Sequence, residues 1–382
     1  MYRELYSRFL AARPGIQHFA CHSHHYWPDV TREATLQYWD DTARLADDKW
    51  TYSFTEKVPR AQQLIAANLN LSDPERIVFA PNTHEFVVRL LSCFAPDEPL
   101  RILTTDSEFY SFDRQINRLS ESDHVEIVKV PVEPFADFHE RFEASLGALK
   151  PQFVFFSHVF FNSGFVCDAE RLSRAAGAVA RMAVVDGYHG FMAVPTDLVK
   201  FDPRAFYLAG SYKYAQGGEG ACFLVVPEGC EERPIDTGWF AELAELDRYT
   251  GAVGYPQKGL RFAGSTMDFT ALYRLIAALE LFRDKGLTVT KIHAHIRKQQ
   301  ALFLSALAGI HHPLLNDRTL MRHDPGDHGH FLTFRLPSVE VTDKLQKELM
   351  EVGFQTDSRG ERLRFGFGLY HEGEYDLSVL RK

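Results

Sequence analysis

A lysine stands between two apolar runs near the middle of the chain. In "GSYKYAQGGEG" (residues 210–220), Lys213 follows "AFYLAG" and precedes "ACFLVVP". Gly-rich stretches are usually loops, so Lys213 could be a solvated turn residue. It could also be a functional amine held between two buried strands. A desolvated lysine has a lowered pKa and becomes both a nucleophile and a base.

Polar side chains also follow other apolar runs, and the residue after each run is a candidate ligand contact. Asn and Ser at strand ends are often simple turn formers. Ligands of parallel sheets, however, bind at the carboxyl ends of the strands, so the convergence of several such ends is informative. The candidates from these ends are Asn82 and Thr83 after "RIVFA", Phe109 after "RILTTD", Asn162 after "QFVFFSH", Asp186 and His189 in "MAVVDGYH", and Ser211, Tyr212 and Lys213 after "AFYLAG".

Pyridoxal phosphate is the cofactor that uses this whole set. It needs a lysine to form an imine and a carboxylate to keep its pyridine nitrogen protonated. It also needs a helix N-terminus for its phosphate and a flat group against its ring. Asp186 lies 27 residues before Lys213, about one helix and one strand. Simpler interpretations remain open: Asp186 and Thr83 as helix caps, and His189 as a core histidine.

These residues require a sheet to bring them together. From residue 76 to residue 227, short apolar runs alternate with helical patterns, which predicts an α/β fold with a parallel sheet covered on both faces. A helical stretch, 268–286, is expected to lead into a second unit. That unit has strand patterns at 330–337 and 362–368 and a helix pattern at 340–353, typical of a small α/β sandwich. We therefore predict a large domain, 46–275, and a second domain formed by 1–45 and 276–382.

Size and composition agree with two domains. The 382 residues exceed the size at which one core usually stops growing, and 45% hydrophobic with 24% charged residues is ordinary for a globular protein. The net charge of −9, without a basic block, argues against nucleic acid or an anionic membrane as partner. No apolar run has the length of a membrane span, and the first residues lack a signal-peptide pattern. The five cysteines form no C-x-x-C pair, which favours reduced thiols and a cytoplasmic location.

The motifs "SYKY", "DGYHG" and "TGWFAE … GLRFAGSTMDFTALYRLIAALELF" resemble kynureninases. These are class V aminotransferase-family members among the fold type I pyridoxal-phosphate enzymes, and the resemblance runs from about Arg76 to Tyr370. It implies a mostly parallel sheet in a large domain, a smaller C-terminal α/β domain and a homodimer with shared active sites. It also implies a small amino-acid substrate.

The resemblance assigns roles to individual residues. Lys213 would carry the cofactor, Asp186 would pair with the pyridine nitrogen, and Phe109 would stack on the ring near His189. Arg364 would bind the substrate α-carboxylate, with Ser23 as a second substrate contact. The residues expected at the phosphate are Thr83, Ser211, Tyr212 and Trp239, joined by Ser265 and Thr266 reaching the site of the partner subunit.

Two segments depart from the kynureninase pattern. The family reads "GNSLG" where this chain has "CHSHHYWPD" (residues 21–29), and "GWFGH" where this chain has "GWFAE". Because these segments contact the substrate side chain in the family, the substrate is open. Glu242 in "GWFAE" would favour a cationic or hydroxylated side chain over an acidic one.

The reaction also stays open at this point. Hydrolytic Cβ–Cγ cleavage needs water at the γ-carbonyl and an acid, for which Tyr212 is the candidate. An aminotransferase or a β-lyase needs fewer groups. A cysteine desulfurase is disfavoured, because no cysteine follows Cys230. A metal protein is a further alternative suggested by His22, His24 and His25, but their spacing matches no zinc module, so no metal site is predicted.

Overall fold

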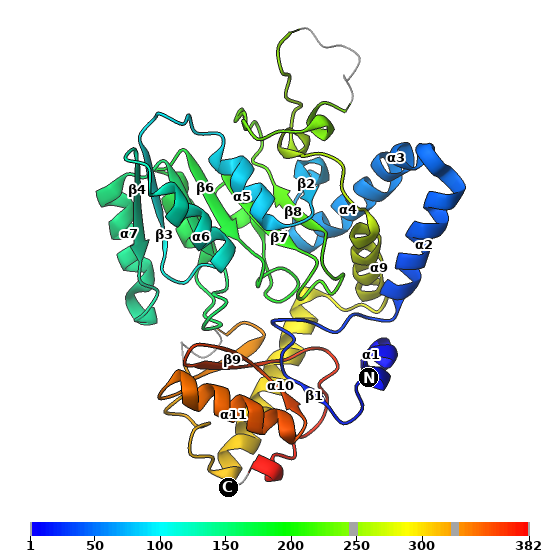
Figure 1. The fold of residues 1–382 in the computed structure, drawn as a ribbon, viewed down its shortest axis with the longest axis vertical. Coiled ribbons are helices and arrows are strands. Elements are labelled where there is room, and N and C mark those ends of the chain that lie inside the picture. Colours follow the sequence, from blue (N-terminus) through cyan, green and yellow to red (C-terminus); the bar gives the residue numbers. More distant parts are fainter. Residues whose placement is uncertain (1, 244–250, 322–327, 381–382) are drawn as a thin grey trace.

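The computed structural model describes residues 2–243, 251–321 and 328–380, and its largest element is a seven-stranded sheet (Figure 1). The strand order is β2-β8-β7-β6-β5-β3-β4. The strands are β2 (Ile77–Ala80), β3 (Leu100–Thr105), β4 (Val125–Val130), β5 (Phe153–Ser157), β6 (Met182–Asp186), β7 (Ala205–Gly210) and β8 (Cys222–Val225). Each lies in an apolar run that predicted a strand.

The sheet is mostly parallel, as predicted, with β8 running antiparallel to its neighbours β2 and β7. Parallel strands need a long crossover connection, usually a helix. Between β7 and β8 the chain has only residues 211–221, without a helix, so it returns antiparallel. The loop that carries Lys213 is therefore a turn between adjacent antiparallel strands.

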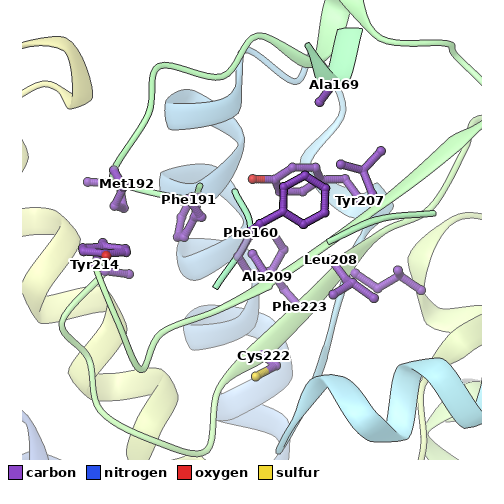
Figure 2. Close-up of a cluster of buried hydrophobic side chains, with 14 of the residues drawn as sticks. Phe160, Ala169, Phe191, Met192, Tyr207, Leu208, Ala209, Tyr214, Cys222 and Phe223 are labelled. Atoms are coloured by element: carbon purple, nitrogen blue, oxygen red, sulfur yellow. The ribbon is translucent and has the colours of Figure 1, made fainter. Parts of the chain in front are cut away.

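Helices follow several strands of the sheet, whose central strands are largely apolar and buried. They are α5 (Thr83–Leu91), α6 (Tyr110–Leu119), α7 (Phe138–Leu149) and α8 (Ala169–Gly177). Every residue of β2, β5, β7 and β8 is buried. Figure 2 shows part of this core, including Phe160, Leu208 and the rings of Tyr207 in β7 and Phe223 in β8, whose centres lie 6.4 Å apart. Burial on both faces fixes the strands, and with them the positions of their carboxyl ends.

The N-terminal region adds helices that the strand–helix pattern did not predict. They are α1 (Ser7–Ala12), α2 (Val30–Leu45), α3 (Lys49–Tyr52) and α4 (Val58–Leu69). The predicted stretch 268–286 forms α9 (Thr270–Asp284), which packs against α2 and α4. The expectation that it leads into the second unit stays a prediction. Many of its side chains are apolar and buried, and the next helix continues into the smaller unit (Figure 1).

The smaller unit is built on α10 (Val289–Ile310), the helix that makes the crossing (Figure 1). Its other elements are β9 (Phe331–Arg335), α11 (Val339–Glu351), β10 (Phe354–Gln355), β11 (Asp357–Arg359) and β12 (Arg362–Gly366). The strands β11, β12 and β9 form an antiparallel sheet in that order. Near the N-terminus, β1 (Gln17–His18) pairs with β10, so the first residues join this unit before the chain enters α2. The domain limits given above remain a prediction.

Short helical turns complete the described chain. They are Arg3–Tyr6, Ala46–Asp48, Ser53–Lys57 (π-type), Pro74–Arg76, Phe135–Asp137, Leu198–Lys200, Trp239–Glu242, Gly259–Phe262 and Ser378–Leu380. Across the described ranges, no helix combines the length and the apolar character that crossing a bilayer requires.

Candidate active site

A cavity of about 410 Å³ lies at the carboxyl ends of the large sheet, and we call it the strand-end cavity. It brings together many of the predicted site residues: Asn82, Thr83, Phe109, Asp186, His189, Tyr212 and Lys213. The sequence analysis did not assign the others that line it: His84, Ser111, Ser157, Val159, Phe161 and Tyr188. Residues from five separate strand ends thus meet in one place.

Lys213 is buried at this cavity, with 9% of its surface exposed. Its Nζ contacts Nε2 of His189 and lies 5.7 Å from the centre of the Phe109 ring. Burial lowers the pKa of Lys213 to about 7, and the positive charge of Arg364 acts in the same direction. The interpretation as a solvated turn residue is wrong for this structure, because the amine is enclosed. At neutral pH a large share of it is unprotonated and nucleophilic.

Close packing explains why a glycine is needed in the loop after Lys213. Gly218 has a φ of +73°, and a Cβ there would lie 2.6 Å from the Trp27 ring. The hydroxyl of Ser211 donates to the Gly218 carbonyl at 2.5 Å. Ser211 therefore holds the loop closed, and it does not line the strand-end cavity. Its predicted phosphate contact remains a prediction.

Asp186 ends β6 in a tight turn. Its Oδ1 accepts the backbone N–H of Tyr188 at 2.8 Å, so the carboxylate does form the turn that the simpler interpretation expects. In the described part of the chain, Oδ2 has no hydrogen-bond donor. Burial raises the pKa of Asp186 to about 6, partly offset by the Tyr188 N–H and the charge of Lys213. The turn thus fixes one oxygen and leaves the other available at the cavity.

His189 lies three residues further and contacts Lys213. Burial and the charge of Lys213 hold its pKa well below the usual value, so its imidazole is neutral. Its Nδ1 is buried without a hydrogen-bond partner among the described residues. A buried, unpaired ring nitrogen costs free energy unless a ligand satisfies it.

The helix α5 begins at Thr83, directly at the cavity. Asn82 caps it by accepting the N–H of Glu85 at 3.0 Å, which leaves the earlier N–H groups of the first turn unpaired by this cap. Helix N-termini attract phosphate, because their free N–H groups and the helix dipole favour an anion. The Asn82 oxygen is already used, so Thr83 and the backbone are the better candidates for an anion.

Arg364 lies next to the cavity in the smaller unit and is only 2% exposed. It donates to the backbone carbonyl of Phe161, a cavity residue, and to Asp357. His22 stacks on Phe331, with ring centres 4.7 Å apart, and its Nε2 lies 3.5 Å from Oδ2 of Asp357. Arg359 donates to Oδ1 of Asp357 at 2.9 Å. We call Arg364, Asp357, Arg359 and His22 the Arg364 cluster.

The sequence analysis missed two groups of this site. Asp357 is one, and its position two residues before Arg359 and seven before Arg364 was the available signal. Glu108 is the other, a buried carboxyl that accepts from Thr105 and from both the N–H and the hydroxyl of Ser157. Burial raises the pKa of Glu108 to about 8. Its neighbour Ser157 pairs in register with Asp186, so Glu108 supports the strand end that holds Asp186.

The N-terminal segment that departs from the kynureninase pattern also reaches the site. The rings of His24 and Tyr212 lie 5.7 Å apart, edge to face. Ser23 and His24 line a second cavity of about 350 Å³, together with Asp357. Glu242, by contrast, accepts the N–H of Gly254 and does not line the strand-end cavity of this chain. The altered histidine segment, rather than Glu242, therefore contacts the site within one chain.

The remaining predicted residues lie elsewhere. The Trp239 indole N–H donates to the Thr266 hydroxyl at 3.1 Å, and this pair, with Ser265, lies outside the strand-end cavity. Asn162 follows the cavity residue Phe161 and does not line the cavity. In the described residues, no group of three or more His, Cys, Asp or Glu side chains is arranged to hold a metal ion. The histidines near the N-terminus pack against aromatic rings instead.

The donor set fits pyridoxal phosphate. A buried amine, a carboxylate with a free oxygen, an unpaired imidazole nitrogen and a helix N-terminus surround one cavity. Phe109 lines the cavity and is 43% exposed, so it is accessible to a ligand there. The volume is within the range of small-ligand pockets.

The fold and this site define a fold type I pyridoxal-phosphate enzyme, which confirms the predicted fold class. A mutant of C-DES with glycine covalently linked to its PLP cofactor has the same fold, with a TM-score of 0.80 at 18% identity over 97% of this chain and 96% of that chain. C-DES is a cystine C–S lyase. The family model for aminotransferase class-V matches residues 28–352, so the chain belongs to that pyridoxal-phosphate-dependent family.

Curated relatives match over shorter stretches. Isopenicillin N epimerase from Amycolatopsis lactamdurans is 29% identical over 174 residues, 44% of this chain and 44% of that protein. Kynureninase from Pseudomonas fluorescens is 29% identical over 163 residues, 38% of each chain. The chain thus spans less than half the length of these relatives, and the two have different reactions.

Proposed function

We propose that the protein hydrolyses the Cβ–Cγ bond of an α-amino acid that bears a γ-carbonyl, with kynurenine or a close analogue as substrate and alanine as product. The observation that carries the proposal is that Tyr212 and Lys213, adjacent in sequence, both line the strand-end cavity. Cleavage of this bond needs a base at Cα and an acid at Cβ, and the two side chains supply these groups.

Bound pyridoxal phosphate would supply an electron-withdrawing ring conjugated to the substrate's α-carbon. Lys213 would hold the cofactor, Asp186 would keep its pyridine nitrogen protonated, and Thr83 with the N-terminus of α5 would take the phosphate. Lys213, with a pKa of about 7, would remove the proton at Cα. Arg364 would bind the α-carboxylate.

Tyr212 would deliver a proton to Cβ after water has added to the γ-carbonyl. Burial raises the pKa of Tyr212, and the nearby carboxylates Glu219 and Asp357 raise it further, so the hydroxyl stays protonated at neutral pH. Replacing it by phenylalanine is expected to lower hydrolysis by about 10²–10⁴, the usual worth of a general acid. Tyr214→Phe is the matched control, because Tyr214 follows Lys213 but does not line the cavity.

Epimerisation at Cα is the second candidate. Isopenicillin N epimerase from Amycolatopsis lactamdurans and kynureninase from Pseudomonas fluorescens are both 29% identical over their matched stretches. Lys213 with Tyr212 gives two proton-transferring groups at one cavity. Such a reaction needs only removal and return of one proton.

The test is incubation with kynurenine and 3-hydroxykynurenine, with and without an added keto acid, followed by mass and chiral analysis. Alanine plus an anthranilate without a keto acid supports hydrolysis. Turnover that requires a keto acid indicates an aminotransferase, and inversion without cleavage indicates an epimerase. Either of these results contradicts the proposed reaction.

A further inference from the structure

The Arg364 cluster contains one carboxylate for two guanidinium groups. Asp357 gives one oxygen to Arg364 and the other to Arg359, at the hydrogen-bond positions described above. In the antiparallel ladder, Asp357 lies directly opposite Arg364, so the backbone register imposes this pairing. Asp357 therefore cannot neutralise both arginines.

The other groups facing this cluster do not change its net positive charge. Burial lowers the pKa of His22 to about 3, with the charge of Arg364 acting in the same direction, so its ring is neutral. Arg362, on the same strand, is paired outside the cluster with Glu133 at 2.8 Å, and Glu133 also pairs with Arg335 at 2.5 Å. Lys213 would be taken up by the cofactor and Asp186 by its pyridine nitrogen. The cluster is left with one unbalanced positive charge.

Arg364 also has unused donors. Its Nη1 donates to the Phe161 carbonyl and its Nη2 donates to Asp357. Its Nε is buried without a hydrogen-bond partner in the described residues. A guanidinium has five N–H groups, so donors remain for one further carboxylate. Arg359 gives Nη1 to both Asp357 and the Ser358 carbonyl, and its side chain is 37% exposed, so water competes for its other donors, whereas Arg364 is enclosed.

We propose that Asp357 is a specificity-determining residue that fits the site to α-amino acids with a single carboxylate and excludes a second carboxylate close to the α-carbon. This inference rests on the proposed amino-acid substrate. One negative charge balances the cluster, whereas a second would meet the Asp357 carboxylate across a site of low dielectric. Like charges placed together at an interface cost several kcal/mol.

The test is titration of the holoenzyme with L-alanine, L-aspartate and L-alaninamide, followed by the cofactor's visible absorbance, which reports binding without turnover. Wild-type protein should bind L-alanine at least about tenfold more tightly than L-aspartate, since each tenfold is 1.4 kcal/mol. Asp357→Asn adds one net positive charge, and the preference for L-alanine should fall by at least about tenfold.

Arg359→Gln changes the charge in the opposite direction. Asp357 would then neutralise Arg364 alone, so affinity for L-alanine should fall at least about tenfold, while L-alaninamide, which has no carboxylate, changes little. The double variant D357N/R359Q restores the original charge and should return the L-alanine preference toward wild type. Glu133→Gln is the matched control, because it removes a carboxylate from an arginine pair of the same sheet outside the cluster.

The outcomes separate this inference from the proposed function. Thermal unfolding identifies any variant that does not fold, and Arg359→Gln with the double variant carries the test if Asp357→Asn fails. An alanine-to-aspartate ratio that is unchanged in Asp357→Asn, or an L-alanine affinity that is unchanged in Arg359→Gln, overturns the inference alone when the wild-type response is normal. Wild-type holoenzyme that responds to no amino acid contradicts the proposed function, and this inference with it.

Discussion

Burial shifts the charged groups of the strand-end cavity toward neutrality, whereas the carboxylate of the Arg364 cluster stays ionised. At the cavity, burial dominates: it lowers the pKa of Lys213 to about 7 and raises that of Asp186 to about 6. In the cluster, burial also raises the pKa of Asp357, but nearby His22 and the charges of Arg364 and Arg359 bring it well below its usual value.

The difference lies in how closely opposite charges are placed. Lys213 contacts a neutral histidine rather than a carboxylate, so desolvation brings it toward neutrality. Asp357 touches two guanidinium groups, which keep it ionised. One region is therefore suited to exchanging protons near pH 7, and the other to binding a fixed charge.

The largest expected effect concerns the cavity lysine. Lys213→Ala should abolish borohydride-fixed pyridoxal phosphate and lower activity by on the order of 10³-fold or more, because nucleophile and base are both lost. Mass analysis of the reduced protein locates the label. A Lys213→Ala protein that still holds reducible, covalently bound cofactor would show that this lysine is not the attachment site.

The next effect tests whether Asp186 is more than a turn former. Asp186→Ala should retain some cofactor but lower activity by roughly 10²-fold, because a neutral pyridine is a poorer electron sink. The control is Asp197→Ala, since Asp197 makes the same kind of turn bond, to the N–H of Val199 at 3.2 Å, on the surface. Equal activity in the two variants would mean that Asp186 serves only to form the turn.

A third prediction concerns the residues outside the cavity. If Ser265 and Thr266 bind the cofactor phosphate of the partner subunit, the protein is a dimer. The S265A/T266A variant should then bind the cofactor about tenfold more weakly, because hydrogen bonds to a charged group are lost. Mixing this variant with Lys213→Ala protein should restore tight binding, because each mixed dimer has one complete site. A monomer with full cofactor occupancy would exclude the shared site.

An effect of similar size is the pH dependence that distinguishes the two regions. Lys213 is protonated below its lowered pKa of about 7 and free above it, so capture of pyridoxal phosphate by cofactor-free protein should rise from pH 6 to pH 8 and then level. The expected gain is about tenfold. Asp357 and His22 of the Arg364 cluster, whose pKa values are both lowered, should not titrate in this range. Stopped-flow absorbance measures the rate, and a rate that keeps rising toward pH 10 would mean an unshifted lysine.

Much of the large unit could be predicted from sequence. The apolar runs that become β2, β5 and β7 are wholly buried, so composition alone marks them, and the residues after parallel strands lie at one edge of the sheet. This placed Lys213, Asp186, His189, Phe109 and Thr83 in one cavity. The motifs also predicted membership of the class V family, and the family model confirms it.

The sequence did not reveal which side chains would meet across distant segments. His22 and Asp357 are 335 residues apart, yet they lie together because β1 pairs with β10 in the smaller unit. The contacts of α9 with α2 and α4 likewise join segments that are far apart in the sequence, and only the fold shows them.

Local pattern by itself determined the elements, the strand ends and the chemical types available there. Tertiary structure decided the charges: the identity of Asp357 is visible in the sequence, but its ionisation depends on the two arginines within hydrogen-bond distance. Lys213 is equally visible, but its lowered pKa depends on enclosure by residues from five strand ends. Desolvation and Coulomb interactions act through space, so no linear pattern encodes them directly.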